Sequence, residues 1–442
     1  MTSRSASRSI NPNSLTHPGD TKDFSPAVIA PTFNNARTLC NILDRLERLG
    51  YPLIVVNDGS TDATAEQLAA WTNHGRAVPI TVITHARNRG KAAAMRSGFA
   101  TAKAAGHTHV ATMDTDGQLD PEDIPALFRV ATESRDALVL GVRRRDIPDC
   151  PKSSHFAWWM TALGIFLETG RRVLDSQCGL RVYPLQVIEF IRCRSGRYAF
   201  ESEVITRALW AGSSLVTVPV TCRYLPHSER VSHFKPWRDG MHSFFMHFAL
   251  TVRRVIPWPL PGLDRHRGFG GNIAQRAAAR DSVKQLSGIR KWWNWVDPLT
   301  VWRQVRTDRF EQLLVAAALG IGAFVGNMPM GGWQILLAAY VAKRTHVHAI
   351  PVVATSLLCL SPITESLSKL AIGTGYLLLH FSLPNLDVLV PEHLTHWQRL
   401  ARVPVAWPIG AIIVGFFCTW IVLPIFERLL RLVPVRKTVD ES

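Results

Sequence analysis

The sequence lacks any cysteine pattern typical of a disulfide framework or a zinc site. Its seven cysteines are odd in number, scattered along the chain and never arranged as C-x-x-C. A reducing compartment therefore fits the soluble part of the chain. Residues 1–23 also lack an apolar run and are rich in Ser, Arg, Asn and Pro. We expect this segment to be a disordered leader and not a signal peptide.

Acidic residues are scarce as well. The chain has 34 Asp and Glu against 50 Lys and Arg, a net charge of +16, and only 19% of its residues are charged. This excess predicts a polyanionic partner, and the 47% hydrophobic content excludes a largely disordered chain. Half of the excess, +8, lies in Val252–Arg309, directly before the most apolar part of the sequence. That position favours a membrane surface, and we expect no nucleic-acid partner.

Residues 24–238 have the pattern of an α/β domain. Short β-branched runs alternate with amphipathic segments, which predicts a mostly parallel sheet with helices on both faces. The expected strands are Ala27–Ala30, Leu53–Val56, Ile80–Thr84, His109–Met113, Ala137–Val142, Gly179–Tyr183 and Leu215–Val220. Ligands of such sheets lie beyond the carboxyl ends of the strands.

The rest of the chain predicts a helical membrane domain over 310–430, after a juxtamembrane linker over 239–309 and before a tail over 431–442. Met241–Pro259 resembles an interfacial helix. Gln312–Ala342 is uncharged but interrupted midway, so a hairpin and one kinked helix both remain open. Val403–Phe426 is the clearest span, and the arginines after it place the C-terminus in the cytosol. We therefore expect a multi-pass protein of the cytoplasmic membrane whose soluble domain faces the cytosol, although the shorter segments also fit core helices of a soluble domain.

Polar turns follow three of the expected strands. Asn34 follows the first strand, Asp58 follows the second, and Asp114, Asp116 and Gln118 follow the fourth. Two carboxylates and an amide at one turn suit a hard divalent cation, Mg²⁺ or Mn²⁺, that neutralises a diphosphate. The alternative is that Asp114 and Asp116 cap the next helix, but Asp120 before Pro121 is better placed for that role.

Several other motifs allow a functional and a structural interpretation. Asn88–Lys91 opens a helix and would attract phosphate, or it is a solvated surface loop. Asp175 and Arg181 flank a glycine and either pair with each other or position an acceptor. Glu201 opens another helix, where an acidic residue is favoured by the dipole alone. A basic patch, either a solvated face or a site for a phosphate at the membrane, contains Arg223, Arg230 and Lys235.

Together these motifs resemble family 2 glycosyltransferases, and in particular the dolichyl-phosphate mannose synthase-like polyprenyl-phosphate glycosyltransferases. The resemblance implies a GT-A fold and a nucleotide-sugar donor. It also implies that a set of strand-end residues contacts the donor: Pro31, Thr32, Asn34, Asp58, Lys91 and Asp114. The metal would be held by Asp114, Asp116 and Gln118, and the candidate catalytic residues are Asp116, Asp175, Arg181 and Glu201. Outside this match, Phe310–Phe426 is similar to an uncharacterised bacterial membrane domain.

The expected reaction is inverting transfer of a sugar to a membrane polyprenyl phosphate, whose anionic oxygen needs no strong general base. One alternative is transfer to a lipid or glycan hydroxyl, with Glu201, Glu203 or Asp175 as the base. The Q-x-x-R-W motif of processive family members is absent. A second alternative is a membrane transport module whose transferase-like domain is inactive.

Overall fold

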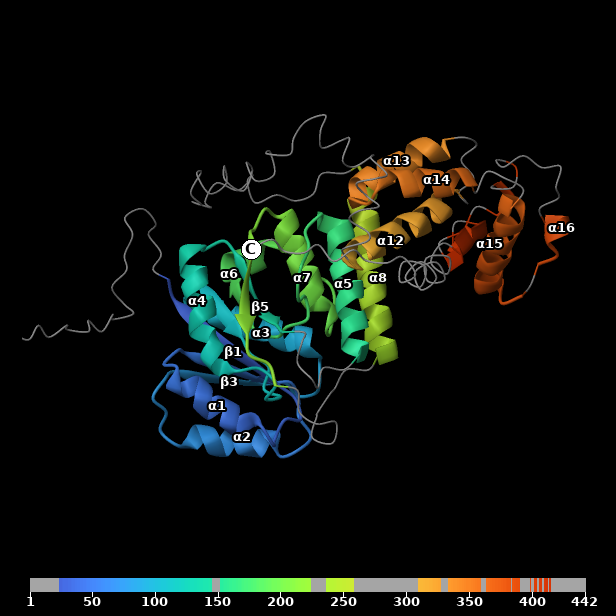
Figure 1. Ribbon diagram of the computed structural model, residues 1–442. Coiled ribbons are helices and arrows are strands. Elements are labelled where there is room, and N and C mark those ends of the chain that lie inside the picture. The colour runs from blue at the N-terminus through green and yellow to red at the C-terminus, as the bar shows by residue number, and fades with distance from the viewer. Residues whose placement is uncertain are drawn as a thin grey trace, which may run out of the picture. The chain divides into compact units, whose positions relative to one another are not determined.

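The computed structural model describes residues 24–144, 152–223, 236–257, 309–326, 333–358, 363–382 and 384–389, with a few positions between 398 and 414 (Figure 1). The chain divides into two compact units. The first contains the described residues within 1–151 and 175–243, and the second contains those within 152–174, 244–259 and 274–442. The second unit thus includes 152–174, a segment that lies inside the predicted 24–238 domain.

The first unit is built on a seven-stranded sheet with the order β3-β2-β1-β4-β6-β5-β7. The strands are β1 (Pro26–Thr32), β2 (Leu53–Asn57), β3 (Ile80–Thr84), β4 (His109–Thr112), β5 (Leu138–Arg143), β6 (Arg181–Pro184) and β7 (Leu215–Val220). All seven predicted strands are confirmed, with ends within two residues of those expected. Only β6 is antiparallel to its neighbours, β4 and β5, so the mostly parallel sheet is also confirmed.

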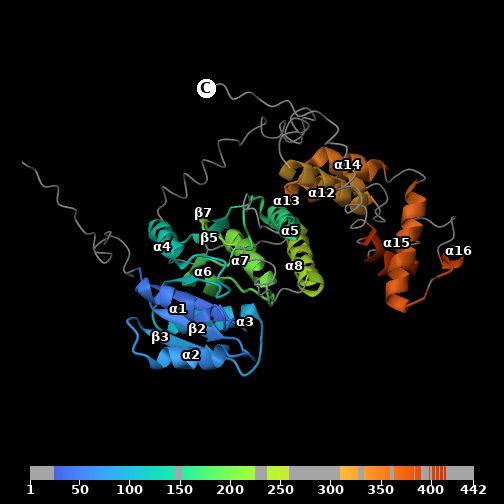
Figure 2. The same ribbon diagram turned by 60° about the horizontal axis from the view of Figure 1, so that its bottom comes forward.

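Helices cover both faces of this sheet, as predicted. One face packs against α1 (Leu39–Arg48), α2 (Thr64–Asn73) and α4 (Ile124–Glu133), whose apolar side chains share a core with alternate residues of the strands. Figure 2 shows α1 lying alongside α2. The other face packs against α3 (Lys91–Ala104), where Gly98 approaches Ile29, and α7 (Ala199–Trp210), whose Phe200 lies near Phe99 of α3. The short η1 (Pro121–Asp123) and α6 (Leu185–Phe190) complete the unit.

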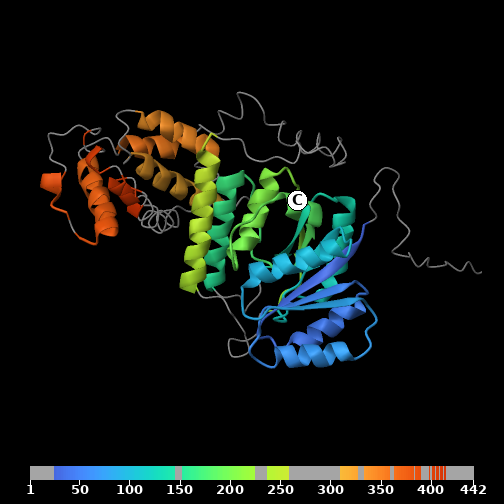
Figure 3. The ribbon, with the colours of Figure 1, turned by 180° about the vertical axis from the view of Figure 1, so that it is seen from behind.

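The second unit is helical. Its helices are α5 (Lys152–Thr169), the part of α8 (Pro236–Val255) from Phe244 onward, α12 (Arg309–Gly326), α13 (Gln334–Thr345), α14 (Ala349–Leu358), α15 (Ile363–His380) and the short α16 (Leu386–Leu389). One core joins α5, α12, α13 and α14, with Leu163, Leu314, Ala338 and Val352 buried in it. Figure 3 shows α5 and α8 running side by side, and the Nδ1 of His247 on α8 lies 2.7 Å from Glu168 Oε1 of α5.

Within the described part of the chain, none of the helices is both long and apolar enough to cross a membrane. The uncharged segment predicted over 312–342 contains most of α12 and most of α13, which are separate helices. Most of the predicted span Val403–Phe426 lies outside the described residues, as do the leader at 1–23, most of the linker and the tail at 431–442.

Candidate active site

The carboxyl ends of the parallel strands carry a cavity of about 300 Å³. The loops that follow β1, β2 and β3 line it, because parallel strands release their next residues at one edge of the sheet. The last residues of β2 and β3, Asn57 and Thr84, line the cavity, together with loop residues that include Phe33, Ser60 and Asn88. The cavity therefore lies where the sequence predicted that a ligand would bind.

The loop after β1 is tied to the loop after β2 through Asn34. Its side-chain oxygen accepts a hydrogen bond from the Thr61 backbone N–H at 2.8 Å, and its own N–H donates to Ser60 Oγ at 3.0 Å. Asn34 adopts a left-handed conformation, with φ of 50°, which asparagine tolerates better than most residues. Nearby, the Pro31 carbonyl accepts from Thr115 Oγ1 at 3.3 Å, and the hydroxyl of buried Thr32 has no partner among the described residues.

Asp58 is buried and holds the start of α3. Its carboxylate accepts hydrogen bonds from the backbone N–H groups of Arg89 at 3.0 Å and Gly90 at 2.7 Å. It also lies 2.6 Å from Nδ1 of His85. Both carboxylate oxygens are therefore engaged inside the protein. Gly59 next to it has φ of 70°, and a Cβ there would lie 2.3 Å from the Arg87 carbonyl carbon, so this turn requires glycine.

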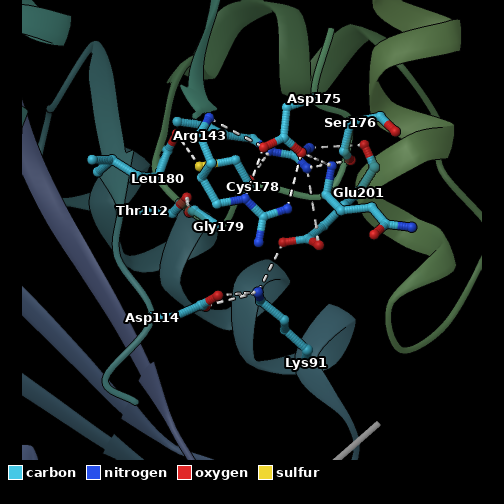
Figure 4. Close-up of polar contacts among 12 residues, drawn as sticks. Lys91, Thr112, Asp114, Arg143, Asp175, Ser176, Cys178, Gly179, Leu180 and Glu201 are labelled. Carbon is cyan, nitrogen blue, oxygen red and sulfur yellow. Dashed lines mark hydrogen bonds and ion pairs between the residues drawn. The ribbon is translucent and has the colours of Figure 1, made fainter. Parts of the chain in front are cut away.

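Lys91 at the first turn of α3 lies between two carboxylates from distant parts of the chain (Figure 4). Its Nζ is 2.7 Å from Asp114 Oδ1 and 2.9 Å from Glu201 Oε1. Burial lowers the pKa of Lys91, but the two carboxylates outweigh burial and the net shift is upward. The ammonium therefore stays charged and is paired with both carboxylates, beside a helix N-terminus at which anions bind favourably.

Asp116 differs from Asp114 in its surroundings. Burial first, and then the charge of Asp114, raise the pKa of Asp116 to about 6, although Lys91 and Arg143 oppose the shift. The Gln118 backbone N–H donates to Asp116 Oδ1 at 3.0 Å, so the turn folds around this carboxyl group. A bound cation next to Asp114 and Asp116 would relieve the repulsion that raises this pKa. Asp58 and this turn are connected through the neighbouring residues Gly90 and Lys91.

Asp175 and Arg181 do not pair with each other. Asp175 instead forms a two-point ion pair with Arg143, with Arg143 Nε 2.7 Å from Asp175 Oδ2. Arg181 is fully buried, and its guanidinium donates to the backbone carbonyls of Cys178, Ser176 and Glu201. These contacts shape the segment beside Asp114 (Figure 4), so Asp175 and Arg181 hold the site in place from within the protein.

The sequence interpretation missed Arg143. It ends β5, and the rule that functional residues follow strand ends could have identified it. Of the predicted acceptor residues, Arg223 is exposed, and its backbone N–H donates to the Gln118 carbonyl at 2.8 Å, so it lies beside the Asp116 turn. Arg230 and Lys235 lie outside the described residues.

The described residues contain no group of three His, Cys, Asp or Glu that could hold a metal ion. Asp114 and Asp116 supply two hard oxygen ligands at one turn, which is a common protein contribution to a magnesium site when substrate phosphates and water supply the rest. The donor set therefore fits a cation that is shared with a phosphorylated substrate.

Two family models match the chain. Residues 27–189 match the model described as Glycosyl transferase family 2, and residues 301–438 match a model described as an uncharacterized protein conserved in bacteria (DUF2062). The chain contains a family 2 glycosyltransferase domain. The first match covers β1 to α6 and includes Asp58, Lys91, Asp114 and Asp116.

Several curated proteins are similar to this glycosyltransferase domain. An uncharacterized protein of Methanocaldococcus jannaschii is 28% identical over 46% of this chain and 90% of that protein. The dodecaprenyl-phosphate galacturonate synthase of Rhizobium johnstonii is 28% identical over 39% of this chain and 52% of that enzyme. The undecaprenyl-phosphate 4-deoxy-4-formamido-L-arabinose transferase of Proteus mirabilis is 34% identical over 37% of this chain and 50% of that enzyme. The chain thus spans about half the length of these two transferases.

Among solved structures, glucosyl-3-phosphoglycerate synthase from Mycobacterium tuberculosis, in complex with Mn²⁺, UDP and phosphoglyceric acid, is similar at a TM-score of 0.39 and 16% identity. The similarity covers 51% of this chain and 78% of the synthase.

Proposed function

We propose that the protein is an inverting glycosyltransferase with a GT-A fold that moves a sugar from a nucleotide-sugar donor to a membrane polyprenyl phosphate. The observation that carries this proposal is that Lys91, paired with Asp114 and Glu201, begins α3 directly after the loop whose Asn88 lines the cavity at the carboxyl edge of the sheet. A nucleotide-sugar requires a cavity for its nucleoside and a positively charged side chain close by for its phosphates. The two curated transferases named above are similar to this domain and carry polyprenyl-phosphate acceptors in their names.

In this proposal the cavity lined by Phe33, Asn57 and Ser60 takes the nucleoside. The connected loop, held by Asp58, presents the N-terminus of α3 and Lys91 to the diphosphate. Asp114 and Asp116, with Gln118 at the same turn, would hold Mg²⁺ or Mn²⁺. When bound, such an ion supplies charge neutralisation to the departing diphosphate.

An oxygen of the acceptor phosphate attacks the anomeric carbon from the side opposite the leaving group. The bond from this carbon to the diphosphate oxygen breaks, and its electron pair leaves with the nucleoside diphosphate, so the configuration inverts. Because the acceptor oxygen is already anionic, the chain only has to position it and stabilise the leaving charge. We assign the role of attracting that phosphate to Arg223, whose backbone binds the Asp116 turn, and to Arg230 and Lys235.

The bonding of the other acidic residues favours a phosphate acceptor over a hydroxyl. Asp175 is bound to Arg143, Glu201 to Lys91, and Glu203 accepts from the Ser195 N–H and from Arg207. Burial raises the pKa of Glu203, but its hydrogen bonds outweigh burial and lower it, which makes it a weak base. A hydroxyl acceptor would instead require Asp116, whose pKa of about 6 suits proton transfer in the absence of a metal.

For the membrane, we propose that the helical second unit keeps the enzyme at the cytoplasmic membrane, with the transferase domain facing the cytosol. The net charge of +16 and the basic segment before the apolar region support this arrangement.

The test uses the full-length protein purified in detergent. Nucleotide-sugars are first screened by thermal shift with Mn²⁺ and with EDTA, and the best donor is then assayed with undecaprenyl phosphate and with diacylglycerol. We expect transfer to undecaprenyl phosphate that depends on the metal and falls at least about 100-fold in Asp116→Asn. Transfer only to diacylglycerol would show that the acceptor is a lipid hydroxyl and not polyprenyl phosphate. A protein that binds no nucleotide-sugar would contradict the enzyme assignment.

A further inference from the structure

Two arginines in the second unit join the carboxyl ends of α8 and α13. Arg344 Nε donates to the Arg254 carbonyl at 2.9 Å, and Arg254 Nε donates to the Arg344 carbonyl at 3.2 Å. The terminal nitrogen of Arg344 also donates to the Ile256 carbonyl at 3.3 Å. Tyr340 supports the junction through a 2.6 Å hydrogen bond from its hydroxyl to the Val255 carbonyl. The two guanidinium groups are therefore held near each other by the fold.

Within the described part of the chain, neither guanidinium forms a salt bridge with a carboxylate. Their partners are carbonyl groups at two helix ends, and each helix end carries roughly half a negative charge. The two guanidinium groups together carry two positive charges, and the two helix ends together carry about one negative charge, so about one positive charge remains at this junction. Like charges that are packed together without a carboxylate are unfavourable unless an anion binds between them.

The hydrogen-bond donors lead to the same conclusion. A guanidinium has five N–H donors and no acceptor. Arg344 uses two of its nitrogens on carbonyls, and Arg254 uses one on a carbonyl and one on Nε2 of His346 at 3.1 Å. The remaining donors have no partner among the described residues. Planar guanidinium groups with donors to spare suit the oxygens of a phosphate, which they can bind at two points.

His346 completes the polar side of this junction. Because Nε2 accepts from Arg254, that nitrogen is unprotonated, and a neutral ring then carries its hydrogen on Nδ1. Two neighbours restrict the imidazole ring of His346. A Cβ at Gly170 would lie 3.0 Å from ring atoms, and the Phe166 ring packs edge-on with 6.4 Å between the ring centres. An imidazole held in this way can donate one further hydrogen bond to an anion.

An exposed apolar stripe on α8 leads to the arginine pair. Phe245, Phe248 and Val252 of α8 and Ile256, directly after its last residue, recur at helical spacing, and between 37% and 59% of each residue is exposed. Residues at this spacing share one face of a helix. The stripe ends at Ile256, whose carbonyl is bound by Arg344. A ligand with a phosphate and a hydrocarbon chain matches both the arginine pair and the apolar stripe, whereas a free phosphate would leave the stripe exposed to water.

We propose that Arg254, Arg344 and His346 form a site for the phosphate group of an anionic lipid, whose hydrocarbon chains lie along the apolar stripe of α8. This lipid site is separate from the candidate active site and does not rest on the proposed transferase reaction. It gives the second unit a task of its own: it fixes α8 and α13 against a bilayer that contains phosphate headgroups.

Isothermal titration of the full-length protein with three soluble probes tests the lipid site. Dihexanoyl phosphatidic acid carries the phosphate and the chains, dihexanoyl phosphatidylcholine carries the same chains without net charge, and inorganic phosphate carries no chain. We expect phosphatidic acid to bind at least about tenfold more tightly than either of the others. Equal affinity for the two lipids would show that the arginines do not recognise the charged phosphate and would overturn the proposal. Inorganic phosphate binding as tightly as phosphatidic acid would leave only a phosphate site and overturn the lipid assignment.

The double variant Arg254→Gln/Arg344→Gln tests the residues. It should weaken phosphatidic acid binding at least about tenfold. The matched control is Arg171→Gln/Lys343→Gln, which removes the same charge from two exposed positions of the same unit and should change binding less than about twofold. Because the arginines also join two helices, thermal unfolding without lipid shows whether each variant folds. If the glutamine variant does not fold, Arg254→Lys/Arg344→Lys replaces it, since it keeps the charge but loses two-point binding and should still weaken the complex. Wild-type affinity in a folded double variant would refute the proposal.

Discussion

Replacing Gly179 by alanine tests whether the position of Asp114 sets the rate of the proposed reaction. Gly179 lies directly against this carboxylate, and an added Cβ would be 2.0 Å from Asp114 Oδ2. Carbon and oxygen that are not bonded approach to roughly 3.3 Å. The carboxylate must therefore move by about 1 Å or more, away from the place where it meets Lys91.

The expected magnitude follows from that displacement. A reacting group misplaced by about 1 Å can lower the rate roughly 100-fold, which corresponds to about 2.7 kcal/mol of transition-state stabilisation. The effect on folding should be smaller. Asp114 is 27% exposed on its side chain and can turn toward solvent, so the overpacking cost should stay near the low end of the usual range, about 1 kcal/mol.

The assay measures kcat/KM for sugar transfer with the donor identified by thermal shift, together with urea unfolding. Gly196→Ala is the matched control, because a Cβ there meets nothing within 4 Å. We expect the control to keep wild-type activity and Gly179→Ala to lose about 100-fold in kcat/KM. A folded Gly179→Ala protein within threefold of wild type would show that the position of Asp114 does not limit the reaction.

Three further predictions concern charge in the first unit. Burial lowers the pKa of His109 to about 4. As the pH falls, this histidine is therefore protonated in the unfolded chain before it is protonated in the folded protein. The free energy of unfolding should consequently drop by up to about 3 kcal/mol between pH 6.5 and 4. His109→Gln should flatten this decline in urea titrations at several pH values, and an unchanged slope would contradict the assignment. Asp175→Asn leaves Arg143 without its buried partner and should cost about 3 kcal/mol of unfolding free energy, much of it recovered in Asp175→Asn/Arg143→Met. Lys91→Met should weaken donor binding at least about tenfold in calorimetry, whereas Lys103→Met on the same helix, an exposed residue, should not, and equal losses would argue against a phosphate contact by Lys91.

The strands and the strand-end motifs could be predicted because their signals are local. Val28, Val55 and Ala111 lie in short apolar runs bounded by polar turns, and those runs became β1, β2 and β4. Asp120 likewise caps η1 by accepting from the Glu122 N–H, as its position before Pro121 suggested. The metal-binding, nucleotide-binding and acceptor roles assigned to these turns stay predictions.

The partners of each charge could not be predicted. Asp175 and Arg181 are close in the sequence and could have paired, yet Asp175 binds Arg143 and Arg181 binds backbone carbonyls. The packing of α5 with the C-terminal helices also could not be predicted, because the sequence of Lys152–Thr169 does not indicate which apolar surface it packs against.

The order of strands and helices along the chain and the residues at the strand ends follow from the amino-acid sequence alone, because the alternation of apolar and polar residues decides which stretches can be buried. The folded structure was needed to show that Asp58 turns inward and holds the start of α3, and that Lys91 contacts Asp114 and Glu201. These contacts do not follow from the sequence because ion pairs and hydrogen bonds act over a few ångströms in space. Packing of the sheet and its helices sets those separations between residues that lie far apart in the chain.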